Sequence, residues 1–305
     1  MYTVPDQTGK RFIITGANSG TGKEATRRIA AAGGEVIMAV RTPAKGEEAK
    51  AEILRETPGA KLEVRQLDLA DLDSVRAFAA SIIDDGTPVD VLVNNAGVMI
   101  PPTRMLTKDG FELQFGTNFL GPFALTMLLL PRILESSSPR VATMSSGVAN
   151  MGRIDFDDLS RAKRYVPWSA YGQSKLADML LGMQLAEVSR EKNLGLLSTI
   201  AHPGFTRTNL QTAGRNLGKD AAMQAKPSDR TFLPSQSVEQ GAEPLLFAAT
   251  DPAAEQGAYY GPGGFAGLVG KTKKTRLPRS ARKDPALPAE LWATAERLTD
   301  TRLAV

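Results

Sequence analysis

The sequence contains no cysteine and only one histidine, His202. Without cysteine, a disulfide, a thiolate metal site and a cysteine nucleophile are all excluded. A single histidine rules out a zinc site built from several histidines and disfavours a Ser-His-Asp triad. We therefore expect no metal site, and any catalysis has to come from other side chains.

Long hydrophobic runs are also missing. The N-terminal residues MYTVPDQTGKRF lack the apolar core of a signal peptide. The most apolar segment, LTMLLLPRIL, is interrupted by Pro131 and Arg132. It is far shorter than the ~20 residues that span a bilayer. We expect a cytoplasmic protein without a membrane anchor.

The excess of positive charge is small. The chain has 37 basic and 33 acidic residues, a net charge of +4. This balance is compatible with an anionic small molecule and too weak to indicate a nucleic-acid partner. The basic run KTKKTRLPRSARK, residues 271–283, is expected to be a solvated loop.

The order of apolar runs predicts an α/β fold. The 305 residues are 42% hydrophobic and 23% charged, which suits a large core. Strand-like runs alternate with helical segments and are apolar throughout, which is typical of parallel strands buried on both faces. We expect one doubly wound parallel sheet of about seven strands, with helices on both faces and right-handed crossovers. The expected strands are RFIIT, EVIMAV, LEVRQLDL, VDVLVNNAG, RVATMSS, LLSTIAHPG and GAYYG.

The whole chain, residues 1–305, is expected to form a single domain, since no linker or composition break divides it. Residues 206–234 are polar and rich in glycine and proline, so they suit either a surface loop or a substrate lid. Residues 265–305 are expected to be a C-terminal extension that ends in a helix over PAELWATAERLTDTRL.

A glycine-rich turn, TGANSGTGK, follows the first predicted strand. Backbone N–H groups at the start of the next helix favour a phosphate there. The spacing is not that of a P-loop, because five residues separate Gly16 from Gly22 and Glu24 follows Lys23. In the first turn of a doubly wound fold, a dinucleotide pyrophosphate is the expected ligand. The candidate contacts are Gly16, Ser19, Gly20, Thr21 and Gly22.

The end of the second strand indicates which dinucleotide is bound. A carboxylate there would hydrogen-bond the ribose of NAD. The sequence has Arg41 instead, and a guanidinium can pair with a 2′-phosphate. We predict NADP(H) in preference to NAD(H). The competing interpretation is that Arg41 faces solvent beside Glu47 or Glu48.

Tyr171 and Lys175 stand four residues apart in the helical run SAYGQSKLADMLLGMQLAEV. Residues at this spacing share one helix face. An adjacent ammonium favours the phenolate and should lower the pKa of the tyrosine, which suits acid/base catalysis at neutral pH. A tyrosine and a lysine on a half-exposed helix, without any chemistry, is the alternative.

Three motifs in order, TGxxxGxG, NNAG at Asn94–Gly97 and YxxxK, make residues 9–210 resemble the short-chain dehydrogenase/reductase family. The runs DGFELQFGTNFLGPFALT, YGQSKLADMLL and HPGFTRTNL are most similar to its retinol dehydrogenase-like branch. The resemblance implies a Rossmann-type fold and hydride exchange between NADP(H) and a carbonyl or alcohol. It also implies a small lipophilic substrate and a homodimer or homotetramer.

The resemblance assigns catalytic roles to four residues. Tyr171 would protonate the carbonyl oxygen, and Lys175 would hold the nicotinamide ribose. Ser146, the second serine of the pair, would donate a hydrogen bond to the substrate oxygen. Asn118 would anchor a water and complete a proton relay.

The resemblance also implies further cofactor and substrate contacts. Trp168, in a long insertion before Tyr171, is a candidate wall of the active-site mouth, and His202 has a packing role or lines the pocket. The implied cofactor contacts are Asp68 and Leu69 at the adenine, Asn95, Ala96 and Gly97 at its ribose, and Pro203, Gly204, Thr206 and Thr208 at the nicotinamide.

Two alternatives stay open. A protein of this fold can be a non-catalytic NADP(H)-binding sensor or structural protein, although this sequence keeps all four catalytic positions. It can also be a reductase of carbon–carbon double bonds, although the related light-dependent enzyme relies on cysteines. The apolar residues of the predicted lid suggest a lipophilic substrate: Phe205, Leu210, Met223, Phe232 and Leu233.

Overall fold

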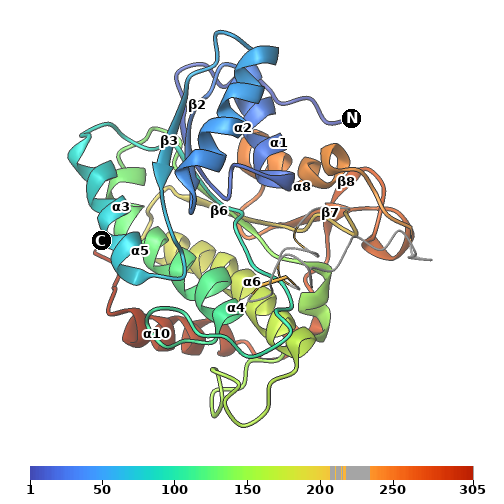
Figure 1. Ribbon diagram of the computed structural model, residues 1–305. Helices are drawn as coiled ribbons and strands as arrows, with labels where there is room; N and C mark the ends of the chain where they lie inside the picture. Colours follow the sequence, from blue (N-terminus) through green and yellow to red (C-terminus); the bar gives the residue numbers. More distant parts are fainter. Residues whose placement is uncertain (207–209, 211–213, 215, 218–233, 305) are drawn as a thin grey trace.

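The computed structural model places all eight strands in one sheet (Figure 1). The structure describes residues 1–206, 210, 214, 216–217 and 234–304. The strand order is β3-β2-β1-β4-β5-β6-β7-β8, and all pairs are parallel except β7 with β8. The strands are β1 (Arg11–Thr15), β2 (Glu35–Val40), β3 (Leu62–Gln66), β4 (Val91–Asn94), β5 (Arg140–Met144), β6 (Leu197–Ala201), β7 (Tyr259–Pro262) and β8 (Thr272–Thr275).

Helices cover both faces of the sheet, as the apolar strands predicted. One face packs on α1 (Gly20–Ala31), α2 (Pro43–Glu56) and α8 (Val238–Thr250). The other packs on α3 (Leu72–Asp84), α5 (Gly121–Ile133), α6 (Pro167–Glu191) and α10 (Leu287–Thr299) (Figure 1). Strands β1, β2, β4, β5, β6 and β7 present their side chains alternately to the two cores, so the doubly wound α/β prediction is confirmed.

The sheet reverses its order between β1 and β4. The carboxyl ends of these strands open into the turns that carry the glycine-rich segment and the NNAG segment. In open parallel sheets the ligand binds outside the carboxyl ends at such a reversal. The fold therefore brings the two predicted cofactor segments to one edge.

The helical run after β4 contains three consecutive segments. Helices α4 (Leu113–Phe115), η1 (Gly116–Leu120) and α5 are continuous, and η1 is a π-helical turn. Residues Leu113–Ile133 are long and apolar enough to cross a membrane by length and composition, with 94% of the apolar window buried in the protein. The expected shortness of the apolar segment was wrong, because the helical residues before it, from Leu113 onward, extend the apolar run. Packing of α5 against α3 and α10 makes it a core helix here.

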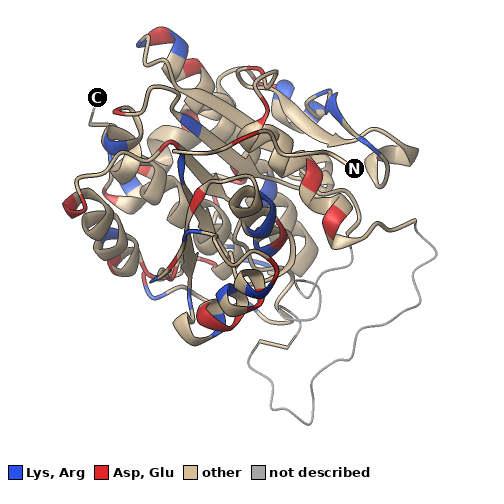
Figure 2. Cartoon of the chain, turned by 90° about the horizontal axis from the view of Figure 1, so that it is seen from above, with Lys and Arg blue, Asp and Glu red and all other residues tan. Residues whose placement is uncertain are grey.

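The basic run near the C-terminus is not the solvated loop that its charge suggested. Its first part forms β8, antiparallel to β7, and Arg279–Arg282 form α9. The charges concealed a strand because Lys273 and Lys274 are exposed on the edge strand of the sheet, where lysine is common. The strand count is eight rather than about seven for this reason. Figure 2 shows basic residues interspersed with acidic ones over the molecule.

Candidate active site

The glycine-rich turn forms a tight cradle between β1 and α1. Gly16 and Gly20 have φ values of +67° and +52°, which favour glycine. A Cβ on Gly22 would lie 2.4 Å from the carbonyl oxygen of Gly16, so only glycine fits. The Asn95 amide donates to the Thr15 carbonyl at 2.9 Å and ties the cradle to the turn after β4.

A cleft of about 530 Å³ opens beside this cradle. It collects the predicted adenosine and phosphate contacts from the turns after β1, β2, β3 and β4. Gly22 does not line the cleft. It lies where α1 packs against the glycine-rich turn, and the absence of a side chain permits this close packing. The sequence-predicted residues that line the cleft are Gly16, Ser19, Gly20, Thr21, Arg41, Asp68, Leu69, Asn95, Ala96 and Gly97.

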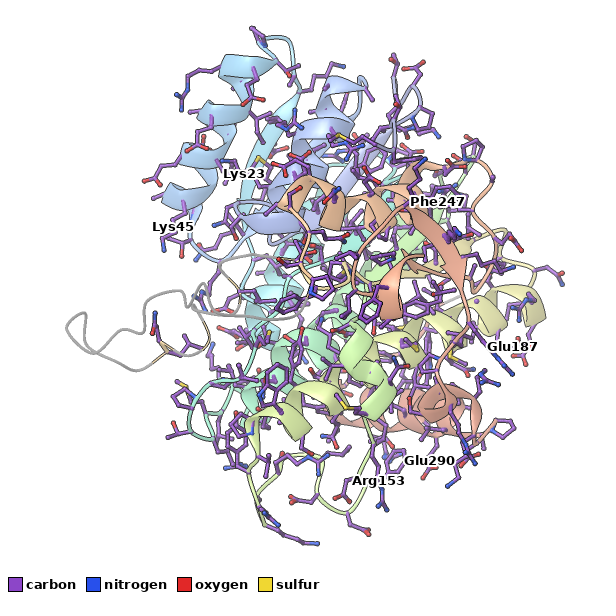
Figure 3. All side chains as sticks on the ribbon, turned by 90° about the vertical axis from the view of Figure 1, so that its right-hand side faces the viewer. Lys23, Lys45, Arg153, Glu187, Phe247 and Glu290 are labelled. Carbon is purple, nitrogen blue, oxygen red and sulfur yellow. The ribbon has the colours of Figure 1, made fainter. Side chains whose placement is uncertain are left out.

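The cleft also contains polar residues that sequence reasoning missed. Thr42 and Lys45 line it beside Arg41, at the N-terminus of α2 (Figure 3). Thr42 makes no side-chain capping bond, and the first turn of α2 holds no acidic residue. Free N–H groups and two cations thus face the same space, which suits an anion. The missed signal was Lys45 standing one turn after Arg41.

The catalytic candidates meet at the carboxyl end of β5. Tyr171 and Lys175 are 5% and 3% exposed, so the predicted half-exposed alternative is wrong. The Ser145 hydroxyl donates to the Lys175 carbonyl oxygen at 2.6 Å and fixes α6 against β5. The Ser146 hydroxyl acts on the Tyr171 phenol and favours a lower pKa of that group, while its predicted hydrogen bond to a substrate oxygen stays a prediction.

Asn118 reaches the same place from the π-helical turn. Its Oδ1 accepts from the Val98 N–H at 2.7 Å, and its Nδ2 donates to the Val98 carbonyl at 3.0 Å and to Ser174 Oγ at 2.9 Å. Ser174 in turn donates to the carbonyl oxygen of Tyr171. A Cβ on Gly97 would lie 3.2 Å from Asn118 Oδ1 and 3.5 Å from Lys175 Nζ. The turn after β4 and the catalytic helix therefore share one polar network.

Burial dominates the electrostatics of this network. It raises the pKa of the Tyr171 phenol, while the Lys175 ammonium and the Ser146 hydroxyl act to lower it. The expected net lowering by lysine was wrong for the structure as described, because desolvation of the phenolate is the larger effect. Lys175 still acts in the expected direction.

Lys175 has a second partner that the sequence interpretation did not consider. Its Nζ donates to Asp178 Oδ2 at 2.7 Å and to the Met144 carbonyl oxygen at 3.1 Å. Burial raises the pKa of the Asp178 carboxyl to about 6, and Lys175 opposes that rise. The available signal was an acidic residue three positions after the lysine, on the same helix face.

The residues directly after β6, Pro203, Gly204 and Thr206, do not line the cleft. Thr206 Oγ1 and Gln236 Nε2 both donate to the Pro203 carbonyl oxygen, at 2.6 and 2.7 Å. Gly204 has a φ of +63°, and a Cβ there would lie 2.4 Å from the Leu268 carbonyl oxygen. Pro203, Gly204 and Thr206 are thus held in place, while Thr208 lies outside the described residues.

His202 packs rather than pointing into the cleft. Its ring lies on Tyr259, with centroids 4.8 Å apart, and beneath the backbone of Gly261. Burial lowers the pKa of His202 to about 4. These contacts agree with the packing role among the two that were predicted.

The insertion before Tyr171, which was predicted to form a wall of the active-site mouth, is hydrogen-bonded to helix α6. Arg161 donates to Gln173 Oε1 at 2.7 Å, and Gln173 donates to the Leu159 carbonyl oxygen at 2.9 Å. The Tyr165 hydroxyl donates to the Pro101 carbonyl oxygen at 3.0 Å. Trp168, 50% exposed, stands at the start of α6. The insertion is therefore an ordered rim beside Tyr171.

Most of the predicted lid, residues 206–234, lies outside the described residues, including Met223, Phe232 and Leu233. Among the described ones, Leu210 packs beside Met99, Ile100, Val148 and Tyr171. Leu210, Gly214 and Leu217 also line the cleft.

Comparison with known proteins agrees with this geometry. Residues 10–216 match the short chain dehydrogenase family. The chain belongs to this family of oxidoreductases, and its fold is the Rossmann-type fold of that family.

Within the family, the chain belongs to the retinol dehydrogenase-like branch. It is 39% identical to human retinol dehydrogenase 13 over 300 residues, which cover 97% of this chain and 85% of that protein. It is 36% identical to mouse polyprenol dehydrogenase over 308 residues, with coverage of 97% and 85%. A crystal structure of an uncharacterised protein from Mycobacterium paratuberculosis superposes with a TM-score of 0.80 at 39% identity and covers 99% of this chain and 97% of that one.

Proposed function

We propose that the protein is an NADP(H)-dependent oxidoreductase that interconverts a ketone or aldehyde and an alcohol, with Tyr171 as the acid/base. The observation that carries the proposal is the meeting of Tyr171, Lys175, Ser146 and Asn118. They come from separate stretches of chain and meet beside a cleft built for a dinucleotide. Such a convergence is the signature of an acid/base site.

Each of the four residues has a distinct task in this proposal. The bound nicotinamide supplies or accepts the hydride. Ser146 orients the substrate oxygen, and Tyr171 gives it a proton in reduction or removes one in oxidation. The Lys175 charge stabilises the phenolate that is formed. Asn118 holds the backbone of Val98 against the catalytic helix.

The cleft fits a dinucleotide that carries an additional phosphate. The glycine turn lines the cleft at the N-terminus of α1, where the N-cap residue Ser19 makes no side-chain capping bond to the first N–H groups of the helix, and such N–H groups favour a phosphate. Arg41, Thr42 and Lys45 surround the N-terminus of α2 at the other end. A 2′-phosphate there would gain charge-assisted hydrogen bonds. These features support NADP(H) over NAD(H).

Apolar side chains near Tyr171 support a lipophilic substrate. Met99 and Ile100 form a cluster with the tyrosine, and Val148 and Leu210 pack on it. The exposed Trp168 extends the apolar surface outward. Two related proteins are named for retinol and polyprenol, both long lipophilic alcohols.

The test is a panel of carbonyl compounds and alcohols, including retinaldehyde, decanal, an aromatic ketone and an enone. The purified protein should oxidise NADPH with an aldehyde or ketone and reduce NADP⁺ with the matching alcohol. Both activities should fall by a factor on the order of 10² or more in Tyr171→Phe. Reduction of the enone at carbon would instead indicate a double-bond reductase. NADPH binding without turnover of any compound would favour a sensor.

A further inference from the structure

The ammonium of Lys175 lies between the phenol of Tyr171 and the carboxylate of Asp178. On one side it faces Tyr171 and the glycine turn at Gly97. On the other it donates to Asp178 Oδ2 at 2.7 Å, in a pair whose side chains are 4% and 2% exposed. The Met144 carbonyl accepts a third contact at 3.1 Å. The Asp178 carboxylate thus binds the Lys175 ammonium on the side that faces away from Tyr171.

Asp178 also changes the charge balance of the catalytic pair. The charged groups that act on Tyr171 are Lys175 and Asp178, both on α6. The elements packed against them offer neutral groups: Ser146 next to η2 (Gly147–Met151), Asn118 from η1 and the Met144 carbonyl from β5. With Asp178 ionised, the buried triad carries no net charge while Tyr171 is protonated.

Loss of a proton from the neutral triad leaves a buried negative charge, which is costly at low dielectric. Without the carboxylate, the same step removes a buried positive charge and becomes easier. The Coulomb effect of Asp178 accordingly raises the pKa of Tyr171. It also raises the pKa of Lys175, against the lowering effect of burial.

We propose that Asp178 is a positioning residue that fixes the Lys175 ammonium and keeps Tyr171 protonated, so that the tyrosine is poised as the acid for carbonyl reduction. The proposal rests on the proposed function, because it assigns a preferred direction of reaction, carbonyl reduction, to the same catalytic site. Asp178 touches neither substrate nor cofactor and acts through Lys175. Its substitution should move a pH profile rather than simply remove activity.

The test replaces the carboxylate with its neutral isostere, Asp178→Asn. NADPH-dependent reduction of an active aldehyde from the panel, such as decanal, should decline with rising pH as the acid is lost. In Asp178→Asn the midpoint of this decline in kcat/KM should lie at lower pH than in the wild type. A merely structural role would lower kcat/KM at every pH and leave the midpoint in place.

Ser189→Ala is the matched control. The Ser189 hydroxyl is a buried hydrogen-bond donor on the same helix and binds the Leu196 carbonyl, far from Lys175. Its loss should change the free energy of unfolding without moving the midpoint. Thermal unfolding of all variants shows whether Asp178→Asn is folded under the assay conditions.

A second measurement needs no turnover. The ultraviolet absorbance of tyrosinate is followed against pH for wild type and Asp178→Asn, each minus its own Tyr171→Phe derivative. The absorbance step of Tyr171 should occur at lower pH without the carboxylate. An unchanged or higher midpoint would overturn the role of Asp178. Failure of the wild type to bind NADPH, seen as unchanged cofactor fluorescence, would instead overturn the proposed function.

Discussion

The indole of Trp168 meets the ring of Tyr171 edge-on, with centroids 6.3 Å apart and planes at 76°. Half of the indole is exposed, so the side chain forms the outer rim of the pocket rather than part of the core. Trp168→Ala should therefore raise the KM for decanal by roughly tenfold, since contact of about one aromatic face is lost. The KM for acetaldehyde, which is too short to reach the rim, should change little. Equal effects on both aldehydes would contradict a rim contact.

Tyr171→Phe should lower kcat by a factor on the order of 10² or more, because the proton donor is lost. NADPH binding should be retained, since the ring and its packing stay. Lys175→Ala should weaken NADPH binding as well as turnover, because the lysine is predicted to hold the ribose. Stopped-flow turnover and NADPH fluorescence titration separate the two effects. Near-normal turnover in Tyr171→Phe would refute the acid/base assignment.

Arg41→Ala should raise the KM for NADPH by roughly tenfold, the value of about one charge-assisted hydrogen bond. The KM for NADH should hardly change, because NADH carries no 2′-phosphate. Arg55→Ala is the control, since Arg55 is exposed in the last turn of the same helix α2. A preference of the wild type for NADH, or an equal effect of Arg41→Ala on both cofactors, would contradict the assignment of Arg41 to the 2′-phosphate.

His202 gives a pH dependence of stability that can be traced to one residue, because it is the only histidine. Its pKa in the folded protein is lowered to about 4 by burial, against about 6.5 when unfolded. The unfolded chain therefore binds the proton first, and stability is lost as pH falls from about 6.5 toward 4. The full effect is about 3 kcal/mol.

The measurement is urea unfolding of wild type and His202→Asn between pH 7 and pH 4 in steps of about half a unit. The carboxyl of Asp178, with its raised pKa, acts in the opposite direction over part of this range. The difference between the two proteins isolates the histidine. A difference that does not depend on pH would show that His202 titrates alike in the folded and unfolded protein, so that its pKa is not lowered by burial.

Much of the fold followed from the sequence because a buried parallel strand must be an apolar run. RFIIT and EVIMAV show this, and they form β1 and β2 as predicted. β8 was missed because its residues Lys273 and Lys274 are exposed and give it the charge of a surface loop. The other edge strand, β3, was predicted because Leu62 and Val64 alternate with its polar residues.

The residues of the candidate site also divide into those that the sequence predicted and those that it did not. Gly16 and Gly22 were predictable because backbone geometry demands glycine. Lys45 and Asp178 were not predicted, because a charged residue three or four positions from another is common on any helix, and the spacing alone does not show that the two lie in one site. The net pKa shift of Tyr171 was mispredicted because the depth of burial cannot be derived from a spacing of four residues.

The two outer strands of the sheet have a consequence for how copies of the chain can associate. Glu63 and Arg65 of β3 and the two lysines of β8 place charge along both edges. An added strand from another copy would have to desolvate these charges, so growth of the sheet from molecule to molecule is unfavourable. Replacing Lys273 and Lys274 with valine should leave the catalytic centre intact and allow this edge to pair with a strand of another copy. With the lysines in place, contacts between copies are expected to form through helix faces rather than along the edges of the sheet.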